Sequence, residues 1–159
     1  MAITVRRVEE ADLEYLRANQ ARPDLNLVDA HFKAQEAGDL IFAVAVEDDT
    51  LLGTTVLDYA SEDLKPELRN MWVYPHARRK GAGRALSEWL EEEARQAGHE
   101  SVYLAVDPNN EKAVPLYVSL EYHPTGEHLF VDDPEVEQVE DGQQASSHYA
   151  IYMKSLTAR

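Results

Sequence analysis

RRKGAG, residues 78–83, sets three cations directly before a Gly-x-Gly pattern. No Asp or Glu occurs from Leu68 to Ser87, although the chain has 30 acidic residues against 15 basic ones and a net charge of −15. The same window also holds Arg69 and Arg84. A local excess of cations in so acidic a chain indicates that an anionic group binds here.

The flanking sequence predicts where this stretch lies in the fold. Residues 67–74, ELRNMWVY, are typical of a strand, and residues 81–97 carry an apolar stripe at helical spacing. The first turn of a helix has unpaired backbone NH groups and a partial positive charge, so it attracts anions. Gly81 and Gly83 lack the Cβ atoms that would keep a phosphate from the backbone. The stretch therefore predicts a site for a di- or polyphosphate.

Composition limits what the chain can be. At 159 residues without a cysteine, it is expected to be one domain, residues 1–159, in a reducing compartment, and we expect a cytoplasmic protein. No apolar run is long enough to span a bilayer, and the acidic surplus argues against nucleic acid or membrane partners. The six histidines have no metal-ligand spacing, so no metal is expected.

Residue patterning gives the remaining elements and predicts an α+β fold with a mixed sheet. We expect an acidic, Gln/Ser-rich mobile loop over residues 132–147. The predicted elements are strand 2–8, helix 9–20, helix 28–38, a hairpin of strands 40–47 and 51–60 around the turn Asp48-Asp49-Thr50, strand 67–74, helix 81–97, strand 101–106, helix 109–120 and a closing strand 148–156.

Two common phosphate-binding patterns fit poorly. The P-loop pattern G-x-x-x-x-G-K-[ST] is absent. Gly81 and Gly83 give the first half of the dinucleotide-binding pattern G-x-G-x-x-G, and Asp107 ends the next strand at a suitable distance, but Leu86 stands at the third glycine position. Too little chain also remains for a doubly wound sheet, so this alternative is disfavoured.

The combined features resemble the GNAT superfamily of acetyl-CoA-dependent N-acyltransferases. The family's pyrophosphate motif [RQ]-x-x-G-x-[GA] reads here Arg78-x-x-Gly81-x-Gly83, after Met71-Trp72-Val73 and Pro75. A second family motif, N-x-x-A-x-x-L-Y, appears as Asn110, Ala113, Leu116 and Tyr117. The resemblance covers residues 2–156, and it implies a GNAT-like, mostly antiparallel mixed sheet of six to seven strands flanked by about four helices.

The chain departs from the family pattern after the second motif. Glu121-Tyr122 stands where Gly-Phe is usual, so the turn that ends this helix is not predicted. Tyr122 can serve as the aromatic core residue. Pro115 lies inside the predicted helix and removes one backbone NH, which predicts a kink or a late helix start near Asn110.

The resemblance implies roles for particular residues. Tyr117 would be the general acid that protonates the coenzyme A thiolate, and Glu67 would be a general base, although it could equally be an exposed carboxylate at a strand end. Asn110 would contact the pantetheine or cap its helix. The segment Met71–Val73 would pair with the pantetheine arm and supply an NH to the oxyanion. The residues implied to bind acetyl-CoA are Met71, Trp72, Val73, Arg78, Arg79, Lys80, Gly81, Ala82, Gly83, Arg84 and Asn110.

The resemblance implies acetyl transfer to a primary amine, and without a cysteine a direct attack in a ternary complex is the simpler route. The regions that shape the acceptor site in the family correspond to residues 21–29 and 127–148, which are acidic here. The hypothesis is therefore a small cationic amine, steered by acids such as Asp24 and Asp29. The alternatives are a protein lysine as acceptor and a non-catalytic acyl-CoA sensor. The closing strand, SHYAIYMKSL, would leave a sheet edge through which a homodimer could form.

Overall fold

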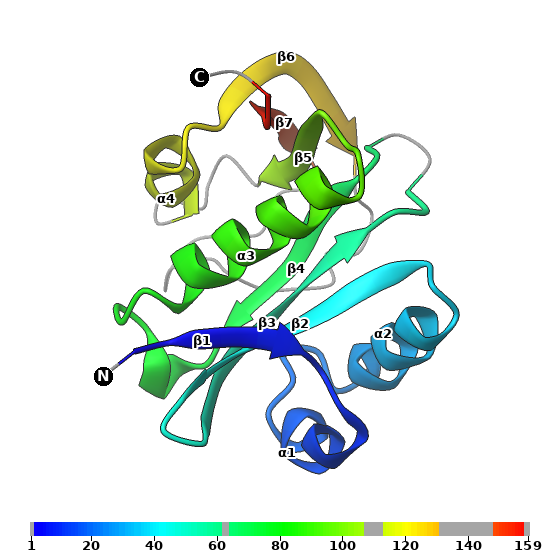
Figure 1. Ribbon diagram of the computed structural model, residues 1–159, viewed down its shortest axis with the longest axis vertical. Helices are drawn as coiled ribbons and strands as arrows, with labels where there is room; N and C mark the ends of the chain where they lie inside the picture. The colour runs from blue at the N-terminus through cyan, green and yellow to red at the C-terminus, as the bar shows by residue number, and fades with distance from the viewer. Residues whose placement is uncertain (1, 62–63, 107–112, 131–147, 158–159) are drawn as a thin grey trace.

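The computed structural model describes residues 2–61, 64–106, 113–130 and 148–157 (Figure 1). Its elements are β1 (Thr4–Arg7), the 3-10 helix η1 (Glu10–Asp12), α1 (Leu13–Ala18), α2 (Leu27–Glu36), β2 (Leu40–Glu47), β3 (Thr50–Asp58), β4 (Glu67–Val73), the 3-10 helix η2 (Pro75–Ala77), α3 (Ala82–Gln96), β5 (Ser101–Val106), α4 (Ala113–Ser119), β6 (His123–Phe130) and β7 (His148–Ser155). The predicted α+β class is confirmed.

The seven strands form one sheet in the order β1-β2-β3-β4-β5-β7-β6. Every neighbouring pair is antiparallel except β4 and β5, which run parallel. Figure 1 shows β1 to β4 together on one side of the molecule and β5 to β7 together on the other. The parallel pair is therefore the seam between two antiparallel halves.

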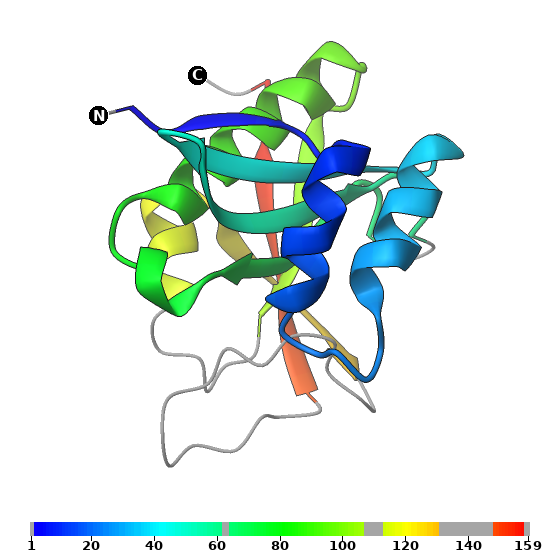
Figure 2. The same ribbon diagram turned by 90° about the horizontal axis from the view of Figure 1, so that it is seen from below.

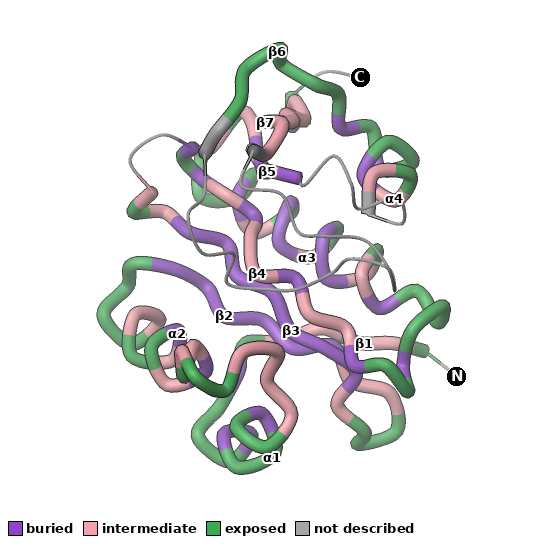
Figure 3. The backbone as a smooth tube through the Cα atoms, turned by 180° about the vertical axis from the view of Figure 1, so that it is seen from behind, coloured by how far each residue is buried: buried purple, intermediate pink, exposed green. Residues whose placement is uncertain are grey.

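Helices cover both faces of the sheet. Figures 1 and 2 show α1 and α2 against one face and α3 against the other. Strand β2 is buried from Leu40 to Ala45 because its residues are covered alternately from the two sides. In Figure 3 the buried backbone runs along β2, β3 and the side of α3 that faces the sheet. This packing fixes the ends of β4 and α3, between which RRKGAG lies.

The β2–β3 hairpin forms at the predicted turn. Asp48 and Asp49 both have positive φ, at 50° and 67°, as a two-residue hairpin turn requires. Aspartate tolerates the left-handed region better than most residues, so the Asp-Asp pair is a suitable choice for this turn.

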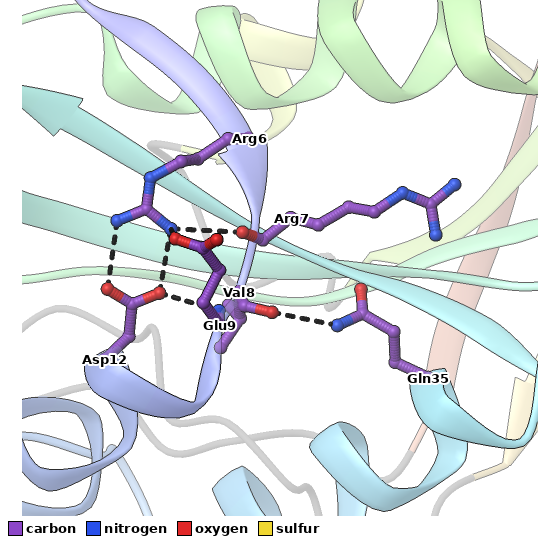
Figure 4. A network of polar contacts seen from close by, with 6 residues as sticks. All are labelled: Arg6, Arg7, Val8, Glu9, Asp12 and Gln35. Carbon is purple, nitrogen blue, oxygen red and sulfur yellow. Dashed lines mark hydrogen bonds and ion pairs between the residues drawn. The ribbon is translucent and has the colours of Figure 1, made fainter.

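A polar network fixes α1 and α2 to the first two strands (Figure 4). The guanidinium of Arg6 donates to both carboxylate oxygens of Asp12, at 2.8 and 2.9 Å, and the Glu9 NH donates to the same carboxylate at 2.7 Å. The side chain of Gln35 donates to the Val8 carbonyl at 3.1 Å and accepts from the Phe42 NH at 2.8 Å. Helix α2 is thus bonded to β2 and to the residue that follows β1.

Two expectations change, and a third concerns residues that the structure does not describe. The single helix expected over residues 9–20 is divided into η1 and α1, because the Asp12 carboxylate bonds the Glu9 NH and tightens the first turn. The expected free edge at the closing strand is wrong, because β7 pairs with β5 on one side and β6 on the other. The edge strands are β1 and β6. The predicted mobile loop, residues 132–147, lies outside the described residues.

Candidate active site

Strands β4 and β5 part where a ligand could bind. Among the described residues, one register pair, Glu67 with Tyr103, joins the two strands. Towards its end β4 also carries a bulge opposite Thr55, at which Asn70 takes a positive φ of 57°. The edge of β4 that faces β5 is thus left without strand pairing after its first residues.

The backbone of Val73 faces this open edge. The Tyr74 NH donates to the Leu52 carbonyl of β3 at 2.9 Å. Because successive backbone groups of an extended strand alternate in direction, the NH and C=O of Val73 point away from β3, towards the side that β5 has left. Val73 therefore offers one donor and one acceptor to an extended ligand.

Helix α3 begins next to this edge. Gly81 is its N-cap, with φ at 95°, where a side chain would be strained. The first intrahelical bond runs from the Ala85 NH to the Gly81 carbonyl, so the three NH groups before Ala85 have no acceptor within the helix. No acidic residue lies in the first turn. The predicted anion site therefore has the required backbone and charge.

Gly83 has a packing role that the sequence did not predict. A Cβ at this position would lie 3.2 Å from Cδ2 of Leu116, which is closer than nearly all real Cβ contacts. The small residue thus lets α4 pack against the start of α3. Arg84 adds to the same contact, since its Nη2 donates to the Ser119 hydroxyl at 2.6 Å.

The three cationic side chains of RRKGAG differ in their contacts. Arg78 donates from Nε to the Val73 carbonyl at 3.1 Å, and its Cζ lies 5.3 Å from the centre of the Trp72 ring. Lys80 pairs with Glu47 at 3.5 Å. Arg79 is exposed and has no hydrogen bond or ion pair to any residue that the structure describes. Of these three cations, Arg79 is the one with a side chain not already engaged.

Tyr117 is set into the core on α4. Its side chain is 8% exposed, and its ring meets that of Tyr122 edge to face, with centroids 5.8 Å apart. It belongs to the same buried cluster as Met71 of β4 and Val106 of β5. Burial raises the pKa of Tyr117 to about 12, so the hydroxyl keeps its proton at neutral pH. This is the form that a general acid needs.

The second motif forms a short helix with an unusual end. Helix α4 starts at Ala113, so Pro115 falls in its first turn, where its missing NH costs least. Glu121 takes φ at 75°, the conformation that glycine usually supplies after a helix. The Tyr122 NH then donates to the Tyr117 carbonyl at 2.9 Å. Asn110 lies outside the described residues.

Glu67 lies at the beginning of β4, far along the strand from Val73. At about 3.3 Å per residue, the four residues from Glu67 to Met71 span about 13 Å. Glu67 pairs across the sheet with Asp58 of β3 and is partly buried. A base at this position would have to reach an amine near Met71 through water.

The acids expected to steer a cation are already paired. Asp24 accepts from Arg22 at 2.8 and 3.0 Å, and Asp29 accepts from Arg17 at 2.8 Å and from Asn26 at 2.9 Å. These partners hold the pKa of both carboxyls below its usual range. The loop between α1 and α2 is thus nearly balanced in charge, because each carboxylate has an arginine beside it.

Two groups near the site were not predicted from the sequence. Glu91 of α3 is buried and bonds the Tyr122 hydroxyl at 2.9 Å and Lys154 at 2.8 Å, which joins α3 to β7. Burial raises the pKa of its carboxyl. His31 of α2 is also buried and lines a small cavity beside Asn70. Both partners of Glu91 are distant in sequence, so no local pattern predicts the contact.

Two searches within the described residues were negative. No helix among them is long and apolar enough to cross a membrane. No cluster of three or more His, Asp or Glu side chains in that part of the chain could hold a metal ion.

The chain is similar to known proteins in its sequence and in its fold. A family model described as "Acetyltransferase (GNAT) family" matches residues 5–122, well over half of the chain. No curated protein sequence matches the chain significantly.

Several solved structures share the fold at low sequence identity. An N-acetyltransferase from Staphylococcus aureus is 18% identical with a TM-score of 0.75, covering 99% of this chain and 100% of its own. A Salmonella typhimurium protein solved with its cofactor acetyl-CoA is 19% identical with a TM-score of 0.74, covering 100% and 96%. The spermidine N-acetyltransferase of Vibrio cholerae, in complex with CoA and spermine, is 16% identical with a TM-score of 0.73, covering 98% and 96%.

Proposed function

Because the chain belongs to the GNAT family of acetyltransferases and is therefore an enzyme that uses acetyl-CoA, we propose that it transfers the acetyl group to the amine of a small molecule by direct attack. The observation that carries this proposal is the meeting of two features at one place. These are the unpaired edge of β4 and the unbonded amides that begin α3. Acetyl-CoA supplies an activated acetyl group as its thioester.

The start of α3 holds the pyrophosphate in this proposal. The NH groups of Ala82, Gly83 and Arg84 donate to phosphate oxygens, and the helix dipole adds a partial positive charge. Arg79 adds a charge-assisted contact, because its side chain is exposed and not otherwise engaged within the described residues. Lys80 and Arg84 contribute at longer range from their present partners.

The open edge of β4 binds the pantetheine arm and stabilises the oxyanion. Val73 donates and accepts as a neighbouring strand would, with Met71 and Trp72 beside it. The carbonyl of Val73 is taken by Arg78 in the free protein. A carbonyl oxygen has two lone pairs, so the Val73 carbonyl can accept from the arm while it keeps the Arg78 bond. An NH of Met71 or Val73 then donates to the thioester oxygen as negative charge develops there.

Two side chains handle protons. Tyr117 donates to the departing sulfur, since its buried hydroxyl is protonated over the whole physiological range. Glu67 takes the proton of the amine through ordered water, because about 13 Å of strand separates it from Met71. Asn110 contacts the pantetheine or caps its helix.

The acceptor in this proposal is a small amine, which is cationic before it loses its proton. A steering role for Asp24 and Asp29 has little support, since both carboxylates are paired with arginines. The chain has no cysteine to form an acyl-enzyme, and this supports attack within a ternary complex.

Calorimetric titration with acetyl-CoA tests the phosphate site. Arg79→Glu places a negative charge beside the start of α3, whereas Arg95→Glu makes the same charge change at the far end of that helix. We expect Arg79→Glu to weaken binding about tenfold or more, the size of a charge-assisted hydrogen bond, and Arg95→Glu to leave the Kd nearly unchanged.

The same preparation then reports on the reaction. Release of free thiol with one class of amine would identify acetyl transfer. Equal weakening by the two variants would mean that binding follows net charge, and absence of binding by the wild type would exclude the proposed site.

A further inference from the structure

A small cavity lies on the face of β4 opposite α3, between the sheet and the α1–α2 pair. It has a volume of about 30 Å³, and its walls include Leu27, Val28, Phe42 and Trp72. The Trp72 indole donates to the Asn19 carbonyl at 2.9 Å, which fixes this wall to the end of α1. Since one water needs roughly 10–15 Å³ by this measure, the cavity admits one small group and not an extended chain.

The polar side of the cavity contains His31, Thr54 and Asn70. His31 is 7% exposed, and its Nε2 is the one buried side-chain nitrogen or oxygen within the described residues that has no hydrogen-bond partner. Its ring packs edge to face on Phe42, with centroids 5.2 Å apart. A buried polar atom without a partner is destabilising, and a ligand in the adjoining cavity would supply the missing partner.

The imidazole is neutral at physiological pH. Burial, followed by the charge of Arg69, lowers the pKa of His31 to about 4. A neutral imidazole has one nitrogen that donates and one that accepts. It therefore suits a neutral partner such as a hydroxyl or an amide, and it has no charge to offer a carboxylate.

The charges around the cavity disfavour a second cation. Arg22 is the one charged side chain among the described residues that line it, and this side chain pairs with Asp24. Asp58, whose charge acts on His31, is bonded by Arg69 at 2.9 and 3.0 Å. An ammonium group entering here would lose its hydration without gaining an unpaired carboxylate.

We propose that His31 determines acceptor specificity, by bonding through Nε2 to a neutral polar group, so that the enzyme acetylates monoamines with a short hydroxyl- or amide-bearing chain in preference to polyamines. This inference rests on the proposed acetyl transfer. It gives a ligand to the cavity at the bulge of β4, where Asn70 is one of the lining residues.

Three acceptors of equal length test the specificity. 3-Aminopropan-1-ol, n-butylamine and 1,3-diaminopropane differ only in a terminal hydroxyl, methyl or ammonium group. For the wild type we expect kcat/KM to fall in that order, with the amino alcohol at least tenfold above the diamine. A wild type that prefers the diamine would overturn the proposal.

Variants of His31 test whether the preference for the hydroxyl depends on Nε2. His31→Leu fills similar space without a polar atom and should lower the preference for hydroxyl over methyl by about threefold to tenfold, the size of one neutral hydrogen bond. His31→Gln retains a polar group near the position of Nε2 and should restore part of the preference for hydroxyl over methyl. The ratio of kcat/KM for the two amines is compared between each variant and the wild type, and this comparison cancels differences in amine basicity. An unchanged preference in His31→Leu would show that the histidine only packs.

Binding without turnover separates this inference from the proposed reaction. In the complex with coenzyme A, 3-aminopropan-1-ol should shift the His31 imidazole signals in ¹⁵N NMR spectra, and n-butylamine should shift them much less. Such a shift without any thiol release would keep the His31 subsite and reject acetyl transfer. No shift at concentrations that support turnover would reject the subsite and keep the reaction.

Discussion

At the scale of single residues, two tyrosines in contact have separate roles. Tyr117 and Tyr122 meet edge to face, and both are buried. The Tyr122 hydroxyl is bonded to Glu91 at 2.9 Å. In the proposed reaction the Tyr117 hydroxyl donates a proton to the departing sulfur, whereas the Tyr122 hydroxyl belongs to the framework.

Tyr117→Phe should lower kcat about a hundredfold, the usual contribution of a general acid, with little change in the Kd for acetyl-CoA. Tyr122→Phe is the matched control, since it should lower the free energy of unfolding and leave kcat within a few-fold of the wild type. Single-turnover rates and thermal unfolding measure the two effects. A Tyr117→Phe enzyme with undiminished kcat would assign the proton to water or another group.

At the scale of elements, α2 is fixed to the sheet through Gln35. Its side chain bonds the Val8 carbonyl and the Phe42 NH, and both residues are almost fully buried. Helix α2 also carries His31, which packs on Phe42. The side-chain amide of Gln35 thus helps to hold α2, and His31 with it, against β2 and the residue that follows β1.

Gln35→Ala should destabilise the protein by about 2–3 kcal/mol, because it leaves two buried backbone groups unpaired. For a chain of this length that corresponds to a fall in Tm of roughly 4–12 °C. Gln96→Ala is the control, because Gln96 is exposed on α3 and should change Tm very little. If the two variants have the same Tm, the Gln35 bridge contributes nothing to stability.

At the scale of the whole molecule, overall and local charge have opposite signs. The chain has a net charge of −15, whereas the start of α3 is cationic and lacks acids in its first turn. Repulsion among the surplus acids destabilises the compact state, and added salt screens it. Attraction between coenzyme A phosphates and the α3 start is screened by the same ions.

Salt should therefore change stability and affinity in opposite directions. The Debye length falls from roughly 14 to 4 Å when NaCl is raised from about 0.05 to 0.5 M. Over this range we expect the Tm to rise and acetyl-CoA binding to weaken several-fold. Differential scanning calorimetry and titration calorimetry in the same buffers measure the two. Loss of both stability and affinity with salt would contradict this separation of charge.

Much of the fold could be predicted because its elements have strong local patterns. The helix expected at 81–97 is found at Ala82–Gln96, and the strand expected at 101–106 is found there. The bulge at Asn70 and the place of β7 inside the sheet have no local pattern. Both depend on which strands pair, and that is settled by packing over the whole chain.

The sequence by itself determined the family motifs, the helix start proposed to bind an anion and the acid-free window around it, because glycine conformation and charge are properties of neighbouring residues. Only the tertiary structure decided that Gly83 accommodates α4, that Arg17 lies beside Asp29, and that Nε2 of His31 has no hydrogen-bond partner within the described residues beside Asn70. These depend on distances between segments far apart in the chain. Those distances follow from how the helices pack on the sheet, which no short stretch of sequence specifies.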